Sequence, residues 1–146
     1  MKTKIHGIAG MVALLTISTF WMSTILVELF GSHDAIALVK RLIIWGMCLL
    51  IPSLIATGIS GGLLGKENKS ELSRRKMKRM PIIALNGLFI LLPSAIVLNY
   101  LASNGAYSNT FYLVQSLELI AGAVNLFLIT ANTKDGFQLT KHPTNS

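Results

Sequence analysis

Residues 113–125, LVQSLELIAGAVN, carry polar side chains inside a run that is otherwise apolar enough to cross a bilayer. At 100° per residue, Gln115, Glu118 and Asn125 fall within about 80° on one face of a helix. A carboxyl group inside a membrane segment can bind a small ligand, accept a proton or hydrogen-bond to a neighbouring helix. Asn86, Pro93 and Tyr100 recur every seven residues in another apolar segment. This spacing predicts that they line the helix face opposite Glu118. Asn86, Gln115, Glu118 and Asn125 form the candidate ligand-binding or proton-accepting site.

The expected protonation of Glu118 depends on its depth and on its partners. The apolar run places Glu118 near the bilayer midplane, where a charge costs at least ~2.5–3.5 kcal/mol. Lys40 and Arg41 lie near the end of another apolar run, where we expect a surface ion-pair cluster with Glu28 and Asp34. The sequence therefore predicts a neutral Glu118 without a countercharge. It either meets a ligand or proton, or serves as interhelical packing that contributes only ~0.6 kcal/mol.

The histidines raise the question of a redox cofactor, because a small membrane bundle can hold haem b between facing histidines. The chain has three histidines, and no two of them lie inside apolar runs at matching depth. His6 is the remaining candidate axial ligand, with His142 or a methionine opposite, and a quinone beside the Glu118 face is a second option. The single Cys48 excludes a CxxC motif, and no metal-binding pattern is present.

The elements that must position these residues are four helices of a membrane protein. Only 13% of the 146 residues are charged, whereas a soluble domain carries roughly a quarter. Each of four apolar segments exceeds the ~20 residues that cross the hydrocarbon core, and they span residues 5–30, 35–64, 81–102 and 107–131. Short connections join them in pairs. The sequence predicts an all-α transmembrane four-helix bundle, up-down-up-down, as one domain with a basic loop at 65–80 and a tail at 132–146.

The basic residues predict the orientation. The loop between the second and third segments is strongly basic, and five of its cations are expected to contact anionic phospholipid headgroups: Arg74, Arg75, Lys76, Lys78 and Arg79. The positive-inside rule places this loop and both termini in the cytoplasm. The net charge of +7 is therefore explained by topology, and nucleic acid is not an expected partner.

Three strings resemble small, uncharacterised four-span inner-membrane proteins of proteobacteria: KIHGIAG, RRKMKRMPIIALNG, and FYLVQSLELIAGAVNL with NTKDG. This resemblance implies a bacterial inner-membrane location and carries no active site. No catalytic motif indicates an enzyme. We therefore expect a non-enzymatic accessory or assembly component whose polar face around Glu118 binds a small ligand or a partner helix. The expected protein partners are another membrane protein or a second copy of the chain. The alternatives are a haem- or quinone-linked electron-transfer protein with His6 as ligand, and a small proton-coupled transporter.

Overall fold

The chain folds into a bundle of long helices in the computed structural model, which describes residues 1–67 and 69–141. The helices are α1 (Lys2–Phe30), α2 (His33–Glu67), α3 (Glu71–Asn86), η1 (Gly87–Leu91), α4 (Leu92–Ser103) and α5 (Asn109–Lys141). The segments α3, η1 and α4 follow one another without a break and form one rod. The described residues contain no strand, and the predicted all-α four-helix fold is confirmed.

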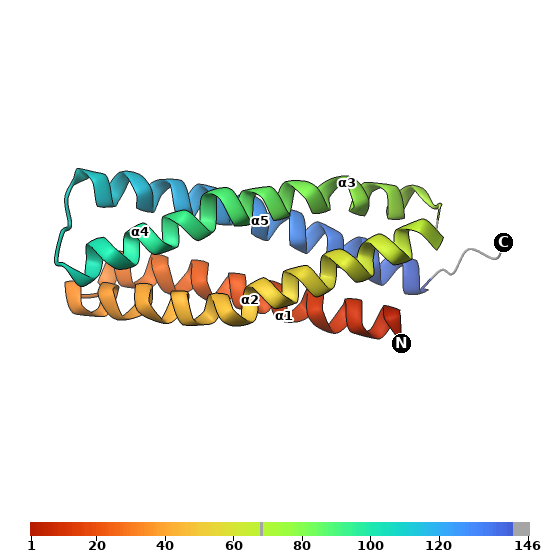
Figure 1. Cartoon of the computed structure of the whole chain (residues 1–146), viewed down its shortest axis with the longest axis horizontal. Coiled ribbons are helices and arrows are strands. Elements are labelled where there is room, and N and C mark those ends of the chain that lie inside the picture. The colour runs from red at the N-terminus through yellow and green to blue at the C-terminus, as the bar shows by residue number, and fades with distance from the viewer. Residues whose placement is uncertain (68, 142–146) are drawn as a thin grey trace.

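All four rods are long and apolar enough to cross a membrane, with lengths of 29, 35, 33 and 33 residues. The chain is therefore a multi-pass membrane protein. Figure 1 shows the start of α1 and the end of α5 at the same end of the bundle, which we call the terminal end. The opposite end, with the connections 31–32 and 104–108, is the loop end. Which end faces the cytoplasm stays a prediction.

The helices extend beyond the apolar segments that the sequence marks. The predicted basic loop 65–80 is largely helical, because α2 continues to Glu67 and α3 begins at Glu71. The Ser70 hydroxyl accepts a hydrogen bond from the Ser73 amide and caps the start of α3. Pro81 consequently lies inside α3 rather than at its first turn. Of the predicted tail 132–146, residues up to Lys141 belong to α5, and His142 lies outside the described residues.

The third rod changes its winding at η1, a five-residue π-helical turn directly before α4. Pro93, the second residue of α4, has no amide hydrogen for the carbonyl of Phe89, and its ring crowds that carbonyl. A wider turn accommodates such a residue. The turn also rotates the following residues relative to the preceding ones. A spacing that keeps residues on the inward face of α3 therefore does not continue onto the inward face of α4.

The interior contains closely packed clusters of apolar side chains together with several buried polar ones, whereas the outer surface carries large hydrophobic side chains. Trp45 and Phe127 are 71% and 73% exposed, as expected for side chains that face lipid. Inside, α1 and α2 approach closely where the ring of Phe20 lies against Gly46 and leaves no room for a Cβ atom. Small residues that let two helices approach closely are the packing feature expected inside a bilayer.

Candidate functional site

A buried ion pair occupies the position where the sequence predicted an isolated acid. Lys40 on α2 donates a hydrogen bond to Glu118 on α5, with 2.9 Å between Nζ and Oε2. The side chain of Lys40 is 0% exposed and that of Glu118 is 11% exposed. Gln115, one turn earlier on α5, donates to the same carboxylate oxygen at 3.0 Å. One Glu118 oxygen therefore accepts two hydrogen bonds, one of them from a cation.

The prediction that Glu118 lacks a countercharge was wrong. Glu118 lies nine residues after Asn109, and Lys40 lies seven residues after His33. These offsets are about 13.5 Å and 10.5 Å along the two helices at 1.5 Å per residue. Both residues thus lie at similar depths from the loop end, and the long lysine side chain spans the remaining distance. The expected surface cluster of Glu28, Asp34, Lys40 and Arg41 forms only in part. Lys40 interacts electrostatically with Glu28 but is buried, and Asp34 and Arg41 form no ion pair with any described residue.

Glu28 near the end of α1 adds a second carboxyl group to this region. It interacts electrostatically with both Lys40 and Glu118. Its Oε1 atom is buried, and within residues 1–67 and 69–141 no hydrogen-bond partner exists for it or for Gln115 Oε1. We call Glu28, Lys40, Gln115 and Glu118 the acid–base centre. Its two acids and one base leave an unbalanced charge when all three are ionised.

A small cavity adjoins the acid–base centre. It has a volume of about 40 Å³ and is lined by Glu118, Thr24 and Gly122 together with apolar side chains. Trp21 on α1 borders it and donates a hydrogen bond to the Leu119 carbonyl at 2.9 Å. Since one water needs roughly 10–15 Å³ of such volume, the cavity accommodates a few water molecules at most.

The candidate residues Asn86 and Asn125 form a separate polar layer. Asn86 donates to the Asn125 side-chain oxygen at 2.8 Å and to the Ala121 carbonyl at 2.8 Å. Asn125 is 0% exposed and donates to the Ile83 carbonyl at 3.2 Å. Seven residues, or about 10.5 Å of helix, separate Asn125 from Glu118. The four predicted site residues therefore divide into two layers instead of one site.

The predicted wall of Asn86, Pro93 and Tyr100 is not present. Asn86 faces the interior, but Tyr100 is 68% exposed. Leu98 and Ala102 of α4 are buried instead, at 0% and 4% exposure. The rotation at η1 accounts for this difference, because a seven-residue spacing holds its face only in an uninterrupted α-helix.

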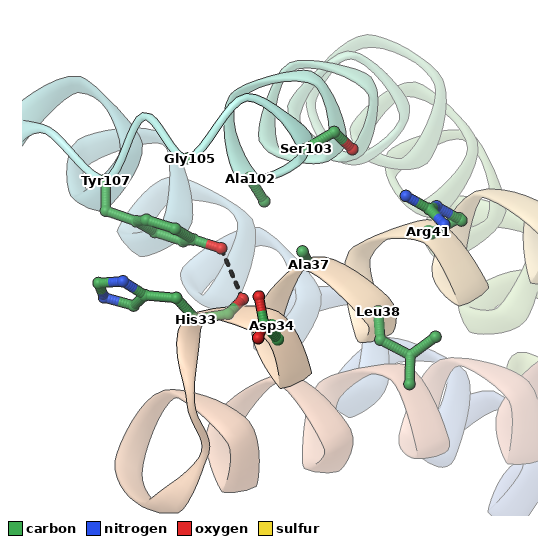
Figure 2. Close-up of a pocket in the computed structure, with 9 residues that line it drawn as sticks. All are labelled: His33, Asp34, Ala37, Leu38, Arg41, Ala102, Ser103, Gly105 and Tyr107. Atoms are coloured by element: carbon green, nitrogen blue, oxygen red, sulfur yellow. Dashed lines mark hydrogen bonds between the residues drawn. The ribbon is translucent and has the colours of Figure 1, made fainter.

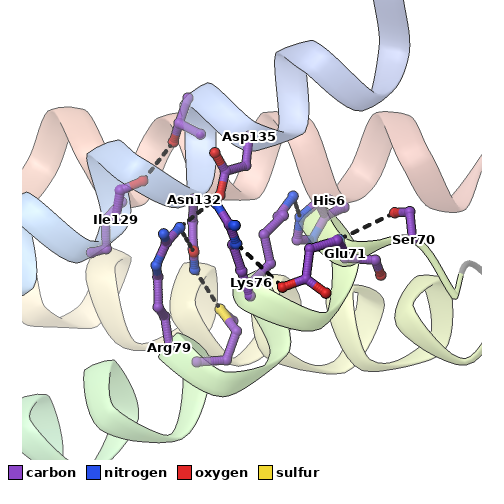
Figure 3. Close-up of polar contacts among 12 residues, drawn as sticks. His6, Ser70, Glu71, Lys76, Arg79, Ile129, Asn132 and Asp135 are labelled. Atoms are coloured by element: carbon purple, nitrogen blue, oxygen red, sulfur yellow. Dashed lines mark hydrogen bonds and ion pairs between the residues drawn. The ribbon is translucent and has the colours of Figure 1, made fainter. Parts of the chain in front are cut away.

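A third polar cluster lies at the terminal end and joins all four rods (Figure 3). Arg79 donates to Asp135 at 2.7 Å and to the Asn132 side-chain oxygen at 3.3 Å. Beside this pair, the Lys76 ammonium lies 3.4 Å from His6 Nε2. The members of this cluster come from α1, α3 and α5, and the His6 ring extends it to α2.

The His6 ring uses both nitrogens for contacts within the bundle. Nδ1 lies 3.2 Å from the Thr57 carbonyl and 3.1 Å from the Ser60 hydroxyl. Because the lysine ammonium can only donate, Nε2 accepts from Lys76, and Nδ1 carries the proton that the carbonyl accepts. Within the described residues no three histidine, cysteine or acidic side chains form a metal-binding group. The residues around His6 do not fit an axial haem ligand, since a cation occupies the coordinating nitrogen.

The five basic residues predicted to contact lipid divide into two sets along α3. Arg74, Arg75 and Lys78 are exposed. Lys76 and Arg79 instead point into the terminal-end cluster (Figure 3). All five residues are strongly polar, so hydropathy does not distinguish the two sets. They differ in the face of α3 on which they lie.

Sequence reasoning placed Lys40 and Glu28 in a surface cluster rather than beside Glu118, and it did not single out Asp135. Lys40 had one signal, because it and Arg41 are cations near the end of the bundle whose two connections, 31–32 and 104–108, contain no Lys or Arg. Comparison with protein-family models, curated proteins and solved structures finds no match to this chain. The resemblance to small proteobacterial membrane proteins therefore stays a prediction.

Proposed function

We propose that the protein is a non-enzymatic membrane component that takes up and releases protons at the acid–base centre. The observation that carries this proposal is the buried Lys40–Glu118 pair with the small cavity beside it. Ionisable groups inside membrane helices are costly and are characteristic of proton relays and ion pathways. This proposal makes the predicted ligand-binding role of Glu118 more specific, because the ligand is a proton.

The size of the cavity supports a proton over an organic ligand. A volume of about 40 Å³ is far below the roughly 300–1,000 Å³ of small-molecule and cofactor sites. A quinone or haem therefore has no space beside Glu118, whereas water does. A partner helix does not reach Glu118 either, since the bundle's own helices cover that face.

The composition of the acid–base centre supports exchange rather than a static pair. Lys40 balances one carboxylate, and the second carboxylate, Glu28 or Glu118, is neutralised by one proton from a hydronium ion. An O–H bond of the hydronium ion breaks, an O–H bond forms on the carboxylate oxygen, and a neutral water molecule remains. Glu28 lies two residues from the end of α1, which favours proton access from the loop end.

The charges at the terminal end support a proposal for the membrane and for the orientation of the chain in it. The exposed Arg74, Arg75 and Lys78 favour contact with anionic phospholipid headgroups at ~1 kcal/mol per cation. They also favour a cytoplasmic terminal end in a bacterial inner membrane. The acid–base centre would then exchange protons with the opposite side.

Infrared difference spectroscopy of the protein in lipid nanodiscs tests the proposal. Acidification is expected to produce a protonated carboxyl band in the wild type. This band should be lost or shifted in Glu118→Gln and in Glu28→Gln, and kept in the matched control Glu67→Gln on the exposed surface. Thermal melting verifies that each variant is folded. A wild type without a titrating carboxyl band, or a band unchanged in both variants of the centre, would refute the proposal.

A further inference from the structure

A second, larger pocket opens at the loop end between the start of α2 and the end of α4 (Figure 2). Its volume is about 410 Å³, and Asp34, Arg41, Ser103 and Tyr107 contribute polar groups to its lining. It is separate from the acid–base centre, since none of that centre's residues line it. We call it the loop-end pocket.

One wall of the loop-end pocket is fixed by contacts of its own. The rings of His33 and Tyr107 stack with their centroids 4.0 Å apart. The Tyr107 hydroxyl donates to the His33 carbonyl at 2.7 Å (Figure 2). Burial, together with the charges of Glu28 and Asp34, raises the pKa of Tyr107, so this donor keeps its proton at neutral pH. The wall therefore joins α2 to the 104–108 connection without using the charges of the pocket.

Arg41 contributes a cation to this pocket and is not part of any ion pair among the described residues. Lys40 and Arg41 are the two basic residues near the loop end, and the buried pair accounts for Lys40. Arg41 is exposed and forms no ion pair with any residue that the structure describes. Asp34, seven residues earlier on the same face of α2, is also outside every ion pair in the described chain. The pocket thus presents one unpaired cation and one unpaired anion.

The position of the pocket along the helix corresponds to the headgroup region of a bilayer. The 35 residues of α2 extend about 52 Å, whereas the hydrocarbon core is about 30 Å thick. The remaining ~22 Å is shared between the two ends. Arg41 lies eight residues after His33, about 12 Å along the helix, and is therefore close to the expected edge of the hydrocarbon.

An apolar strip continues from Arg41 toward the middle of the bilayer. Leu42, Trp45 and Leu49 follow at helical spacing and are 56%, 71% and 56% exposed. Side chains at these intervals lie on neighbouring positions of one helix face. A molecule with a charged head in the pocket and acyl chains on this strip would match both surfaces.

We propose that the loop-end pocket binds the headgroup of a zwitterionic phospholipid of the phosphatidylethanolamine type. The Arg41 guanidinium donates two hydrogen bonds to the phosphate, the contact for which its planar fork is suited. The Asp34 carboxylate accepts from the primary ammonium group, and the acyl chains cover Leu42, Trp45 and Leu49. The lipid belongs to the leaflet at the loop end.

Native mass spectrometry of the detergent-solubilised full chain tests this assignment with added phosphatidylethanolamine and, separately, phosphatidylglycerol. The wild type is expected to retain one phosphatidylethanolamine in preference to phosphatidylglycerol. Arg41→Gln should weaken retention of both lipids about tenfold, as expected for the loss of a charge-assisted contact. Asp34→Asn should abolish the preference between them. Lys134→Gln, which removes an exposed cation near the terminal end, is the matched control and should bind as the wild type does.

Soluble glycerophosphoethanolamine distinguishes a membrane lipid from a water-soluble ligand with the same headgroup. It should compete weakly, because it lacks the acyl chains that contact the apolar strip. Competition as strong as that of the intact lipid would overturn the assignment, as would equal lipid retention by wild type and Arg41→Gln. Melting temperatures confirm folding. If Arg41→Gln is unstable, Arg41→Lys tests the same contact, since it keeps the charge and loses the bidentate geometry.

Discussion

An ion pair near each end of the bundle joins two helices, Arg79–Asp135 at the terminal end and Lys40–Glu118 at the loop end, and these two pairs differ in their access to water. At the terminal end, Arg79 and Asp135 are only 2.7 Å apart, with side chains 26% and 16% exposed. At the loop end, Lys40 and Glu118 are 2.9 Å apart and 0% and 11% exposed. The pair with the shorter distance is thus the more exposed to water, so distance alone does not indicate which pair is the stronger interaction.

The difference in burial determines what each pair contributes to the free energy of unfolding. Water screens the terminal-end pair, and such pairs typically contribute less than about 1 kcal/mol. The buried pair offsets a large desolvation penalty, so removal of one partner is expensive although the pair itself adds little net stability. A buried pair kept at such a cost is a better indication of function than of stability.

The largest effect is expected when only one partner of the buried pair is removed. Lys40→Met should lower the free energy of unfolding by about 3–5 kcal/mol, because it leaves the Glu118 carboxylate buried and unpaired. Denaturant titration in mixed micelles measures this loss. The double variant Lys40→Met with Glu118→Leu should regain most of it. A stable single variant would show that the two ends of the bundle do not differ as proposed.

The polar layer between the two ends should respond less strongly. Asn125→Leu removes an acceptor for Asn86 and a donor for the Ile83 carbonyl, and should cost about 1–3 kcal/mol. Thr130→Val on the exposed side of the same helix is the control, since its hydroxyl contacts only its own helix. Equal unfolding curves for the two variants would contradict a structural role for the asparagine layer.

The terminal-end pair should have a smaller effect that depends on salt. Asp135→Asn is expected to lower the unfolding free energy by less than about 1 kcal/mol at low ionic strength. At high salt the difference from the wild type should vanish, because counterions screen partly exposed charges. A loss that persists at high salt would mean that this pair is as shielded from water as the one at the loop end.

The smallest effect is expected for the outermost pair. Lys2 and Glu67 lie 3.2 Å apart with side chains 58% and 61% exposed. Lys2→Gln should leave the unfolding curve unchanged within error, as for most exposed pairs. A measurable loss would indicate that the headgroup region shields charges more than bulk water does.

The fold followed from the sequence because the bilayer imposes a simple constraint. A segment that crosses ~30 Å of hydrocarbon must satisfy its backbone internally, so four long apolar runs predict four helices. The inward face of α5 was also predictable, since Gln115, Glu118 and Asn125 share one side at helical spacing. Hydropathy marks the edge of the hydrocarbon rather than the end of a helix, which explains why α3 and α5 extend beyond their predicted bounds.

The partners of these residues could not be predicted in the same way. Helical periodicity gives the face of a residue on its own helix, but it does not give the neighbouring helix or the reach of a long side chain. Lys40 was not expected beside Glu118 because the apolar run placed Glu118 near the midplane, whereas Glu118 lies only nine residues after the start of α5 and Lys40 seven after the start of α2. The Asn86–Tyr100 wall failed for another reason, because a local change in winding altered the register within one rod.

That change in winding has a consequence for comparison with other chains. The π turn at Gly87–Leu91 holds one more residue than an α-helical turn, so it is equivalent to a single residue inserted into an uninterrupted α-helix. Homologues that lack the insertion would be one residue shorter between the positions of Asn86 and Pro93. An alignment without a gap there would pair inward-facing positions of one protein with lipid-facing positions of the other.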